Sequence, residues 1–266
     1  MKRLAWLSDI HLNFLSFEDR LEFYDSIVEN RVDAALVSGD IAEAWSLSGV
    51  LAEMVARLPI PVYFVLGNHD YYGRSIAAVR DDAAAAVAKS PSLVYLTQAG
   101  VVKLSERTAL VGHDGWADGR LGDYAGSKVV LNDYVHIREF IGLDSAARLA
   151  QLQALADEAI RHFRRVLPEA LDSYRHVILV THVPPFREAC WHEGHTSGPE
   201  FLPHFASGAL GEALLEIMRP RRRRKLTVLC GHTHGRGTCR PLPNLEVFTA
   251  GAEYGRPEIE QIFAVK

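Results

Sequence analysis

Short apolar runs recur along the chain, and each one stops at a cluster of polar residues. These runs span residues 4–7, 34–37, 62–66, 177–180 and 226–230. Runs this short and almost continuously apolar are typical of strands that are covered on both faces. Helical segments are predicted at 17–30, 47–58 and 75–89. The alternation of strands and helices predicts a layered α/β fold, whose reactive groups collect beyond the carboxyl ends of the strands.

The pattern changes after residue 93. Shorter strands without long helices between them are predicted at 93–95, 101–104 and 109–111, which indicates a second sheet. A long amphipathic helix is predicted at 144–167 and is expected to end before Pro168. Further strands are predicted at 247–249 and 259–265. Because the polar clusters come from both halves of the chain, we expect a single domain over residues 1–266.

Composition narrows the class of protein. The 266 residues are 48% hydrophobic and carry a net charge of −4, so the sequence has no basic field of the kind that dominates nucleic-acid binding. No run of about 18 apolar residues is present, so no membrane span is predicted. The chain has only three cysteines, a small and odd number that does not suit a disulfide framework. Reduced thiols, and therefore a cytoplasmic location, are expected. A homo-oligomer is compatible with the sequence.

The polar clusters at the strand ends supply two carboxylates, four imidazoles and one amide. They are Asp9, His11, Asp40, Asn68, His182, His232 and His234. One histidine at a strand end is explained as a polar cap, but five strands that end alike indicate a shared site. Nitrogen and oxygen ligands without thiolates suit Mn²⁺, Fe²⁺ or Zn²⁺. Seven ligands suit two ions that share a carboxylate. Because only two of the ligands are anionic, two divalent ions would leave the site net positive, and a positive site favours phosphate esters as substrates.

The motifs in which these residues stand resemble those of calcineurin-like metallophosphoesterases. In order, they are D-x-H at 9–11, G-D at 39–40, G-N-H-D at 67–70, T-H at 181–182 and G-H-T-H at 231–234. The resemblance covers residues 4 to about 250. It implies a four-layer α-β-β-α sandwich of two mixed sheets flanked by helices, with the metal site at the strand carboxyl ends. The short motif forms are similar to those of the bacterial small phosphodiesterase branch.

The resemblance also implies a role for each motif residue. Asp9, His11 and His234 would bind the first metal, whereas Asn68, His182 and His232 would bind the second and Asp40 would bridge them. His69 would face the substrate instead of a metal, and Asp70 would hold the tautomer of His69 through a hydrogen bond to its ring. The cofactors would be two divalent ions, Mn²⁺, Fe²⁺/Fe³⁺ or Zn²⁺.

The expected activity is phosphodiester hydrolysis, in which a metal-bridging hydroxide attacks phosphorus opposite the leaving oxygen. A phosphomonoesterase acting on a small metabolite or a phosphoprotein is an alternative. A third reading is a protein-binding scaffold of the same fold without catalysis. All ligands and His69 are present, which favours an enzyme that acts on a small phosphate ester.

Substrate contacts are expected from two segments that the metals do not fix, residues 113–134 and 184–207. The first lacks helical or strand periodicity, and it is either a binding loop containing His113 or a self-packed surface loop. The second follows His182 and is long enough for a lid. Within it, Trp191 and His195 are predicted to touch substrate. The alternative that His192 and His195 bind an additional metal rests on their spacing alone.

Overall fold

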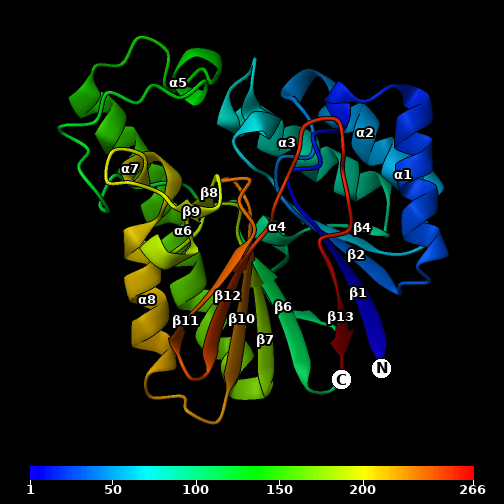
Figure 1. The fold of residues 1–266 in the computed structure, drawn as a ribbon. Helices are drawn as coiled ribbons and strands as arrows, with labels where there is room; N and C mark the ends of the chain where they lie inside the picture. The colour runs from blue at the N-terminus through cyan, green and yellow to red at the C-terminus, as the bar shows by residue number, and fades with distance from the viewer.

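The computed structural model describes residues 1–266 and contains two large β-sheets packed face to face (Figure 1). The first sheet has the strand order β13-β1-β2-β3-β4. The strands are β13 (Gln261–Val265), β1 (Lys2–Leu7), β2 (Ala34–Ser38), β3 (Val62–Val65) and β4 (Leu93–Tyr95). β1 to β4 run parallel, and β13 pairs antiparallel with β1, so the sheet is mixed.

The second sheet is also mixed and has the order β11-β12-β10-β7-β6-β5. Its strands are β11 (Gly237–Leu242), β12 (Leu245–Thr249), β10 (Lys225–Cys230), β7 (His176–Val180), β6 (Thr108–Gly112) and β5 (Val102–Lys103). The four central strands are parallel, whereas the edge strands β11 and β5 are antiparallel to their neighbours. The carboxyl ends of the parallel strands lie at the edge of the sheets away from the two termini (Figure 1).

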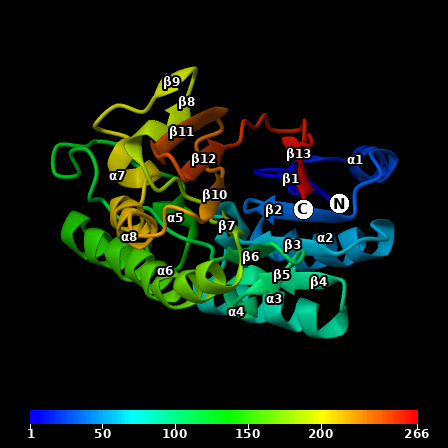
Figure 2. The ribbon, with the colours of Figure 1, turned by 90° about the horizontal axis from the view of Figure 1, so that it is seen from below.

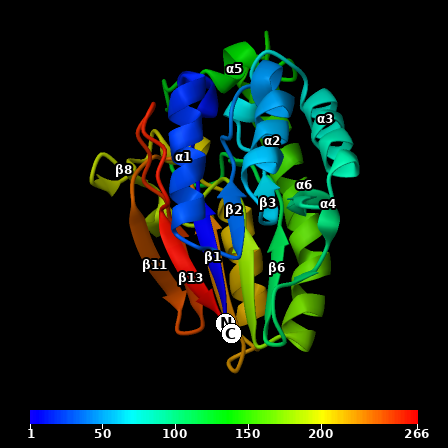
Figure 3. The same ribbon diagram turned by 90° about the vertical axis from the view of Figure 1, so that its right-hand side faces the viewer.

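Helices cover the outer face of each sheet. The helices α1 (Phe17–Glu29), α2 (Ala44–Arg57) and α3 (Ile76–Lys89) stand side by side over the first sheet (Figure 3). The second sheet is covered by α6 (Ser145–Ser173) and α8 (Gly208–Met218), on the opposite side of the molecule (Figure 2). None of the helices is both long enough and apolar enough to cross a bilayer.

Short elements complete the chain. They are α4 (Leu96–Ala99), α5 (Asp133–His136), α7 (Leu202–Phe205), the hairpin strands β8 (Trp191–His192) and β9 (His195–Thr196), and the 3₁₀ turns η1 (Leu12–Phe14), η2 (His69–Tyr71) and η3 (Arg187–Ala189). Several of these turns and short helices follow strands of the two sheets directly.

The continuous apolar runs are explained by apolar layers on both faces of each sheet. In β1, Ala5 and Leu7 face the helices, whereas Leu4 and Trp6 face the second sheet. The residues of β7 alternate in the same way between the layer under α6 and the layer between the sheets. Because neighbouring side chains in a strand point to opposite faces, a strand buried on both sides must be apolar throughout. The predicted four-layer sandwich of two mixed sheets is confirmed. That the chain is a single domain stays a prediction.

Four features of the second half differ from the sequence predictions. The long helix does not end before Pro168 but continues to Ser173. Proline removes one backbone donor, but Ala170 and Leu171 beyond it pack in the layer against the second sheet, and this packing keeps the last turn helical. The sequence predictions also missed α8 and the edge strand β11. Residues 184–207 contain a hairpin and α7, so they are not a wholly irregular loop.

Candidate metal centre

The seven predicted ligands follow β1, β2, β3, β7 and β10, and the fold brings them together where the carboxyl ends of both sheets meet. Their backbone is unusual. Seven non-glycine residues have positive φ, and five of these are predicted ligands: Asp9, His11, Asp40, His232 and His234. Left-handed backbone costs energy in residues with a side chain, and it persists only where the surroundings enforce it. The turns beyond these strands are therefore shaped to aim side chains at one place.

Glycines in the motifs allow the turns to touch. A Cβ on Gly67 would lie 2.2 Å from Oδ1 of Asp40, and a Cβ on Gly231 would lie 1.9 Å from Oδ2 of Asp9. Both distances are far shorter than any real contact, so each glycine makes room for a ligand that comes from another strand. This is the physical reason for a glycine in G-N-H-D and in G-H-T-H.

The first group of ligands is Asp9, His11, Asp40 and His234, each of which offers an atom within 4.8 Å of the others. Nε2 of His234 lies 3.4 Å from Oδ1 of Asp9 and 3.3 Å from Nε2 of His11. Nε2 of His11 lies 3.8 Å from Oδ2 of Asp40. Two carboxylates and two imidazoles at these separations form a pocket that one divalent ion can occupy.

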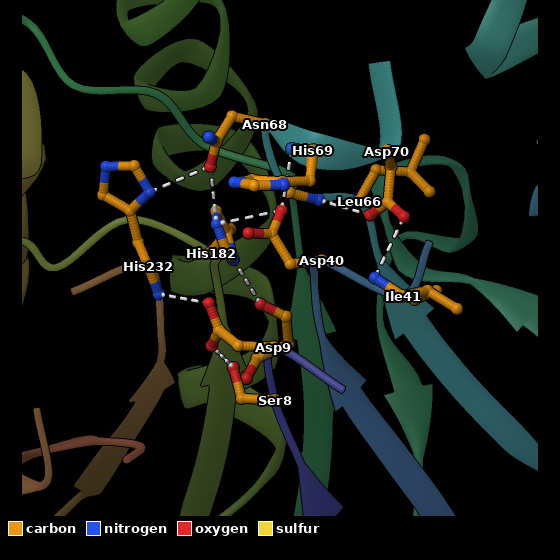
Figure 4. Close-up of polar contacts among 12 residues, drawn as sticks. Ser8, Asp9, Asp40, Ile41, Leu66, Asn68, His69, Asp70, His182 and His232 are labelled. Atoms are coloured by element: carbon orange, nitrogen blue, oxygen red, sulfur yellow. Dashed lines mark hydrogen bonds and ion pairs between the residues drawn. The ribbon is translucent and has the colours of Figure 1, made fainter. Parts of the chain in front are cut away.

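The second group is Asp40, Asn68, His182 and His232. Oδ1 of Asp40 lies 3.4 Å from Nε2 of His182, so the two oxygens of Asp40 face the two groups. Oδ1 of Asn68 lies 3.0 Å from Nε2 of His182 and 2.9 Å from Nδ1 of His232 (Figure 4). The structure therefore brings together all seven predicted ligands in two groups that share Asp40. That these residues bind metal stays a prediction.

Outer hydrogen bonds fix which atoms face the second group. Nδ1 of His182 donates to the Ser38 carbonyl oxygen at 2.9 Å, and Nε2 of His232 donates to the His204 carbonyl oxygen at 3.1 Å. When both imidazoles are neutral, their remaining ring nitrogens therefore present lone pairs inward, toward the Asn68 oxygen. Three electron-pair donors that face one another repel unless a cation lies between them. A metal ion or a proton satisfies this arrangement, so the donor set fits the predicted metal.

The charges of the groups support the same interpretation. Burial opposes ionisation of Asp9, but its hydrogen bond to His234 and the nearby His182 lower its pKa to about 2. Burial likewise opposes a charge on His182, yet Asp40 raises the pKa of His182 to about 10. Burial lowers the pKa of His11 and of His232 to about 4. Burial also opposes ionisation of Asp40, but His182 and His69 hold its pKa well below the usual range. Both carboxylates are thus ionised and attract positive charge into the site.

The comparisons with known proteins agree with this site. Residues 2–236 match the family described as calcineurin-like phosphoesterases, which are dinuclear metal enzymes. The chain belongs to that family. It is a metal-dependent phosphoesterase, and the predicted resemblance is confirmed. No curated protein sequence matches the phosphoesterase.

Solved structures share its fold at low sequence identity. A phosphopantetheinyl hydrolase from Mycobacterium tuberculosis is 18% identical, with a TM-score of 0.64 over 95% of this chain and 89% of that one. A dimetal phosphatase from Danio rerio is 15% identical, with a TM-score of 0.58 over 94% and 87%. GAP50, the anchor in the inner membrane complex of Plasmodium, is 14% identical, with a TM-score of 0.52 over 94% and 71%. At these identities the likeness concerns the fold alone.

His69 of the phosphoesterase lies beside both ligand groups but belongs to neither. Its ring stacks on Tyr72, with centroids 4.3 Å apart and planes at 28°, and it meets the ring of His11 edge-on at 4.7 Å. Its Nδ1 has no hydrogen-bond partner. The side chain lines an open hollow of about 260 Å³ together with Asp40 and His234, and we call this space the histidine hollow. This position is compatible with the predicted contact to substrate.

The prediction that Asp70 holds the tautomer of His69 was wrong. Oδ1 of Asp70 accepts the backbone N–H groups of Ile41 and Ala42 at 2.9 and 2.8 Å, and Oδ2 accepts that of Gly67 at 2.8 Å (Figure 4). Both residues stand in the 3₁₀ turn η2, and this turn directs the buried carboxylate back toward the loop after β2, away from the ring of His69. Asp70 therefore joins two ligand-bearing loops and does not orient the histidine.

The structure places none of the three predicted substrate contacts in the lining of the histidine hollow. His113 is buried beneath α6, where it packs on His162 and faces Glu158 at 3.7 Å. Trp191 packs against Gly237, and a Cβ on that glycine would lie 2.0 Å from the indole. His195 is exposed on the hairpin and lines neither hollow beside the site. The first position after a strand can point to either side of the sheet, and His113 points away from the site.

Residues that the sequence analysis missed line the histidine hollow instead. Tyr72, Asp133 and Tyr254 are among them. Tyr254, half exposed, lies on the loop between β12 and β13 and has its ring 4.5 Å from His11 and 5.0 Å from His234. Because β12 runs parallel to β10, the loop after β12 begins at the same edge. The apolar pattern predicted a strand at 247–249 but not its pairing, so it gave no signal for Tyr254.

Proposed function

We propose that this phosphoesterase hydrolyses phosphodiesters with two metal ions bound at the adjoining ligand groups. The observation that supports two ions is the position of Asp40, which turns one oxygen toward each group. The donors are nitrogen and oxygen atoms only, so we propose ions of the Mn²⁺, Fe²⁺/Fe³⁺ or Zn²⁺ class. The three cysteines are unpaired thiols, in keeping with the reducing cytoplasm that we propose as the compartment.

The preference for diesters rests on the shape around His234. On one side this residue lines the histidine hollow, and on the other it lines a second hollow of about 510 Å³. The second space, which we call the charged hollow, is also lined by Asp9, Arg236 and Glu260. A diester carries two alcohol groups on one phosphorus, and the two hollows offer one space for each. A monoester would fill only one of them.

The two ions, His69 and Tyr72 would have different roles in hydrolysis of the ester. When bound, the two ions activate water and neutralise charge on the phosphoryl oxygens. His69 lines the histidine hollow, and its imidazole would donate a hydrogen bond or a proton to an oxygen of the ester. Tyr72 keeps the His69 ring in place by stacking, so that little reorientation is needed when substrate binds.

The test is a comparison of esters with the Mn²⁺-loaded protein. We expect bis-p-nitrophenyl phosphate to be cleaved with kcat/KM at least about tenfold above that of p-nitrophenyl phosphate, which corresponds to about 1.4 kcal/mol. Cyclic 2′,3′- and 3′,5′-nucleotides extend the panel. A phosphopantetheinyl ester is added because the mycobacterial structure is that of a phosphopantetheinyl hydrolase.

The variant His69→Ala is expected to bind both ions and to lose about 10²–10⁴-fold in kcat, because it removes a general acid but no ligand. His195→Ala serves as the matched control, since that imidazole is exposed and lines neither hollow. Faster cleavage of the monoester would establish the phosphomonoesterase alternative. No turnover of any ester with Mn²⁺, Fe²⁺ or Zn²⁺ would establish the scaffold alternative.

A further inference from the structure

We propose that Asp133, held by Tyr72, is a positioning residue that keeps the amide oxygen of Asn68 turned toward the second ligand group. The inference rests on the two-metal site of the proposed function. Asp133 begins α5, on the segment that follows β6, and the residue is only 3% exposed. It belongs to none of the motifs by which the site was predicted.

The contacts among the three side chains form a closed triangle. Oδ1 of Asp133 accepts a hydrogen bond from Nδ2 of Asn68 at 2.8 Å and another from the Tyr72 hydroxyl at 2.7 Å. The Tyr72 hydroxyl also lies 3.4 Å from the same Nδ2. An ionised carboxylate only accepts hydrogen bonds, so the Tyr72 hydroxyl is the donor of the bond to Asp133. One carboxylate oxygen thus receives two donors, one of which is the amide.

A neutral amide needs such a partner in order to act as a metal ligand. Rotation of the Asn68 side chain by half a turn would exchange its oxygen and its NH₂ group at nearly the same positions. The wrong orientation would place NH₂ against Nε2 of His182 and Nδ1 of His232, which now lie 3.0 and 2.9 Å from the oxygen. An ionised carboxylate accepts hydrogen bonds and cannot donate them. Asp133 therefore favours the orientation in which the oxygen faces the histidines.

The backbone holds Asp133 at this distance from Asn68. The amide of Gly73 donates to the His136 carbonyl at 2.9 Å, and the amide of Arg138 donates to the Arg74 carbonyl at 3.2 Å. These bonds tie the segment around α5 to the loop that follows Asn68. Because Tyr72 also stacks on His69, the same unit contacts both the amide and the histidine of the G-N-H-D motif.

Equilibrium dialysis against Mn²⁺ tests the proposal without any measurement of turnover. The parent protein is expected to bind two Mn²⁺. In Asp133→Ala, the second Mn²⁺ should bind roughly 10–100-fold more weakly, the usual effect of losing a partner that orients a ligand, and the first should bind as before. Asp133→Asn keeps an acceptor oxygen and should restore the affinity to within about threefold of the parent. Tyr72→Phe keeps the carboxylate and the stacked ring, so its loss should be intermediate.

The matched control is Asp118→Ala. Asp118 is also buried on the segment after β6 and accepts the backbone amides of Arg120 and Ala209, but it contacts no ligand. This variant should bind two Mn²⁺ with the affinity of the parent.

Unchanged affinity for the second ion in Asp133→Ala would overturn the proposal, as would an Asp133→Asn protein that binds as weakly as Asp133→Ala. If Asp133→Ala does not fold, Tyr72→Phe provides the test. An affinity for the second Mn²⁺ equal to that of the parent protein in Tyr72→Phe would then overturn the proposal. A parent protein that binds two Mn²⁺ but cleaves no ester would refute the proposed function and leave this inference standing.

Discussion

The position of Asp70 leads to a prediction that separates a structural role from a catalytic one. The carboxylate accepts three backbone N–H groups, two from the loop after Asp40 and one from Gly67. In Asp70→Asn, the amide oxygen can keep the bonds to Ile41 and Ala42, but its NH₂ group then faces the N–H of Gly67. The reverse orientation is worse, because NH₂ would face two donors. Either way, at least one buried donor is left without an acceptor.

The magnitude follows from these bonds. A buried donor left unsatisfied costs about 1–3 kcal/mol, and two bonds that lose the charge of their acceptor weaken by about 0.5–1 kcal/mol each. We therefore expect Asp70→Asn to lower the free energy of unfolding by about 3 kcal/mol. The assay is urea denaturation of the chelator-treated protein, so that metal binding does not contribute. Asp25→Asn, on the exposed side of α1, is the control and should change stability by less than about 0.5 kcal/mol.

A double-mutant cycle with His69→Ala decides between the two roles. If Asp70 acted by orienting His69, its replacement would cost little once the imidazole is gone. The hydrogen bonds of Asp70 go only to backbone amides, so we expect the same loss, within about 0.5 kcal/mol, in the His69→Ala background. A loss below about 1 kcal/mol, or one that disappears in that background, would refute the reasoning.

Four further outcomes are expected. Gly67→Ala should abolish binding of two Mn²⁺ in equilibrium dialysis, because its Cβ would overlap Oδ1 of Asp40. Gly49→Ala is the control, since a Cβ there meets open space on α2, and it should bind both ions. Asp114→Asn should lower stability by about 3–5 kcal/mol, since it breaks a buried ion pair with Arg80. Burial opposes the charge of Asp114, but Arg80 holds the pKa of Asp114 below its ordinary value of 3.8. The stability that the carboxylate contributes is therefore present above that pH and is lost as the pH falls further. In Asp114→Asn, the free energy of unfolding should fall less steeply with decreasing pH than in the parent, and equal slopes would contradict this. Chelation should lower Tm by about 5–10 °C, and an unchanged Tm would argue against metal in the folded state. Tyr254→Ala should raise KM for aryl esters by about three- to tenfold with little change in kcat, and an unchanged KM would exclude the ring from the substrate site.

The sequence predicted the scaffold and the meeting of the seven candidate ligands at one edge, and both predictions rest on one physical reason. A strand buried on both faces must be apolar, so the place where polarity begins marks the carboxyl end of the strand. Asp9, Asp40 and His182 were found by that rule, and the structure places them at the predicted edge. Resemblance to a family then divided the ligands between two ions, which strand ends alone could not do.

The errors have an equally physical origin. The direction of a side chain beyond a strand end depends on the local turn, and the 3₁₀ turn at Asp70 sends the carboxylate toward backbone amides instead of toward His69. His113 follows β6 as directly as other site residues follow their strands, yet it points beneath α6. The loop that carries Tyr254 reaches the site because β12 is parallel to β10, a pairing that the apolar pattern does not reveal.

The backbone conformation of the predicted metal-binding residues is strained, and the rest of the chain must stabilise it. Five ligands have left-handed φ values, and at about 1–3 kcal/mol each they would cost on the order of 5–15 kcal/mol in isolation. That sum is comparable with the whole stability of a typical domain. The strained turns can persist only because buried groups beneath them hold the backbone in this conformation through hydrogen bonds. Asp70 receives three backbone amides, and Asp114 accepts from Leu66, Tyr71, Tyr95, Thr97 and Arg80 directly under the loop that carries Asn68. Buried carboxylates that touch neither ligand group therefore determine where the ligands stand.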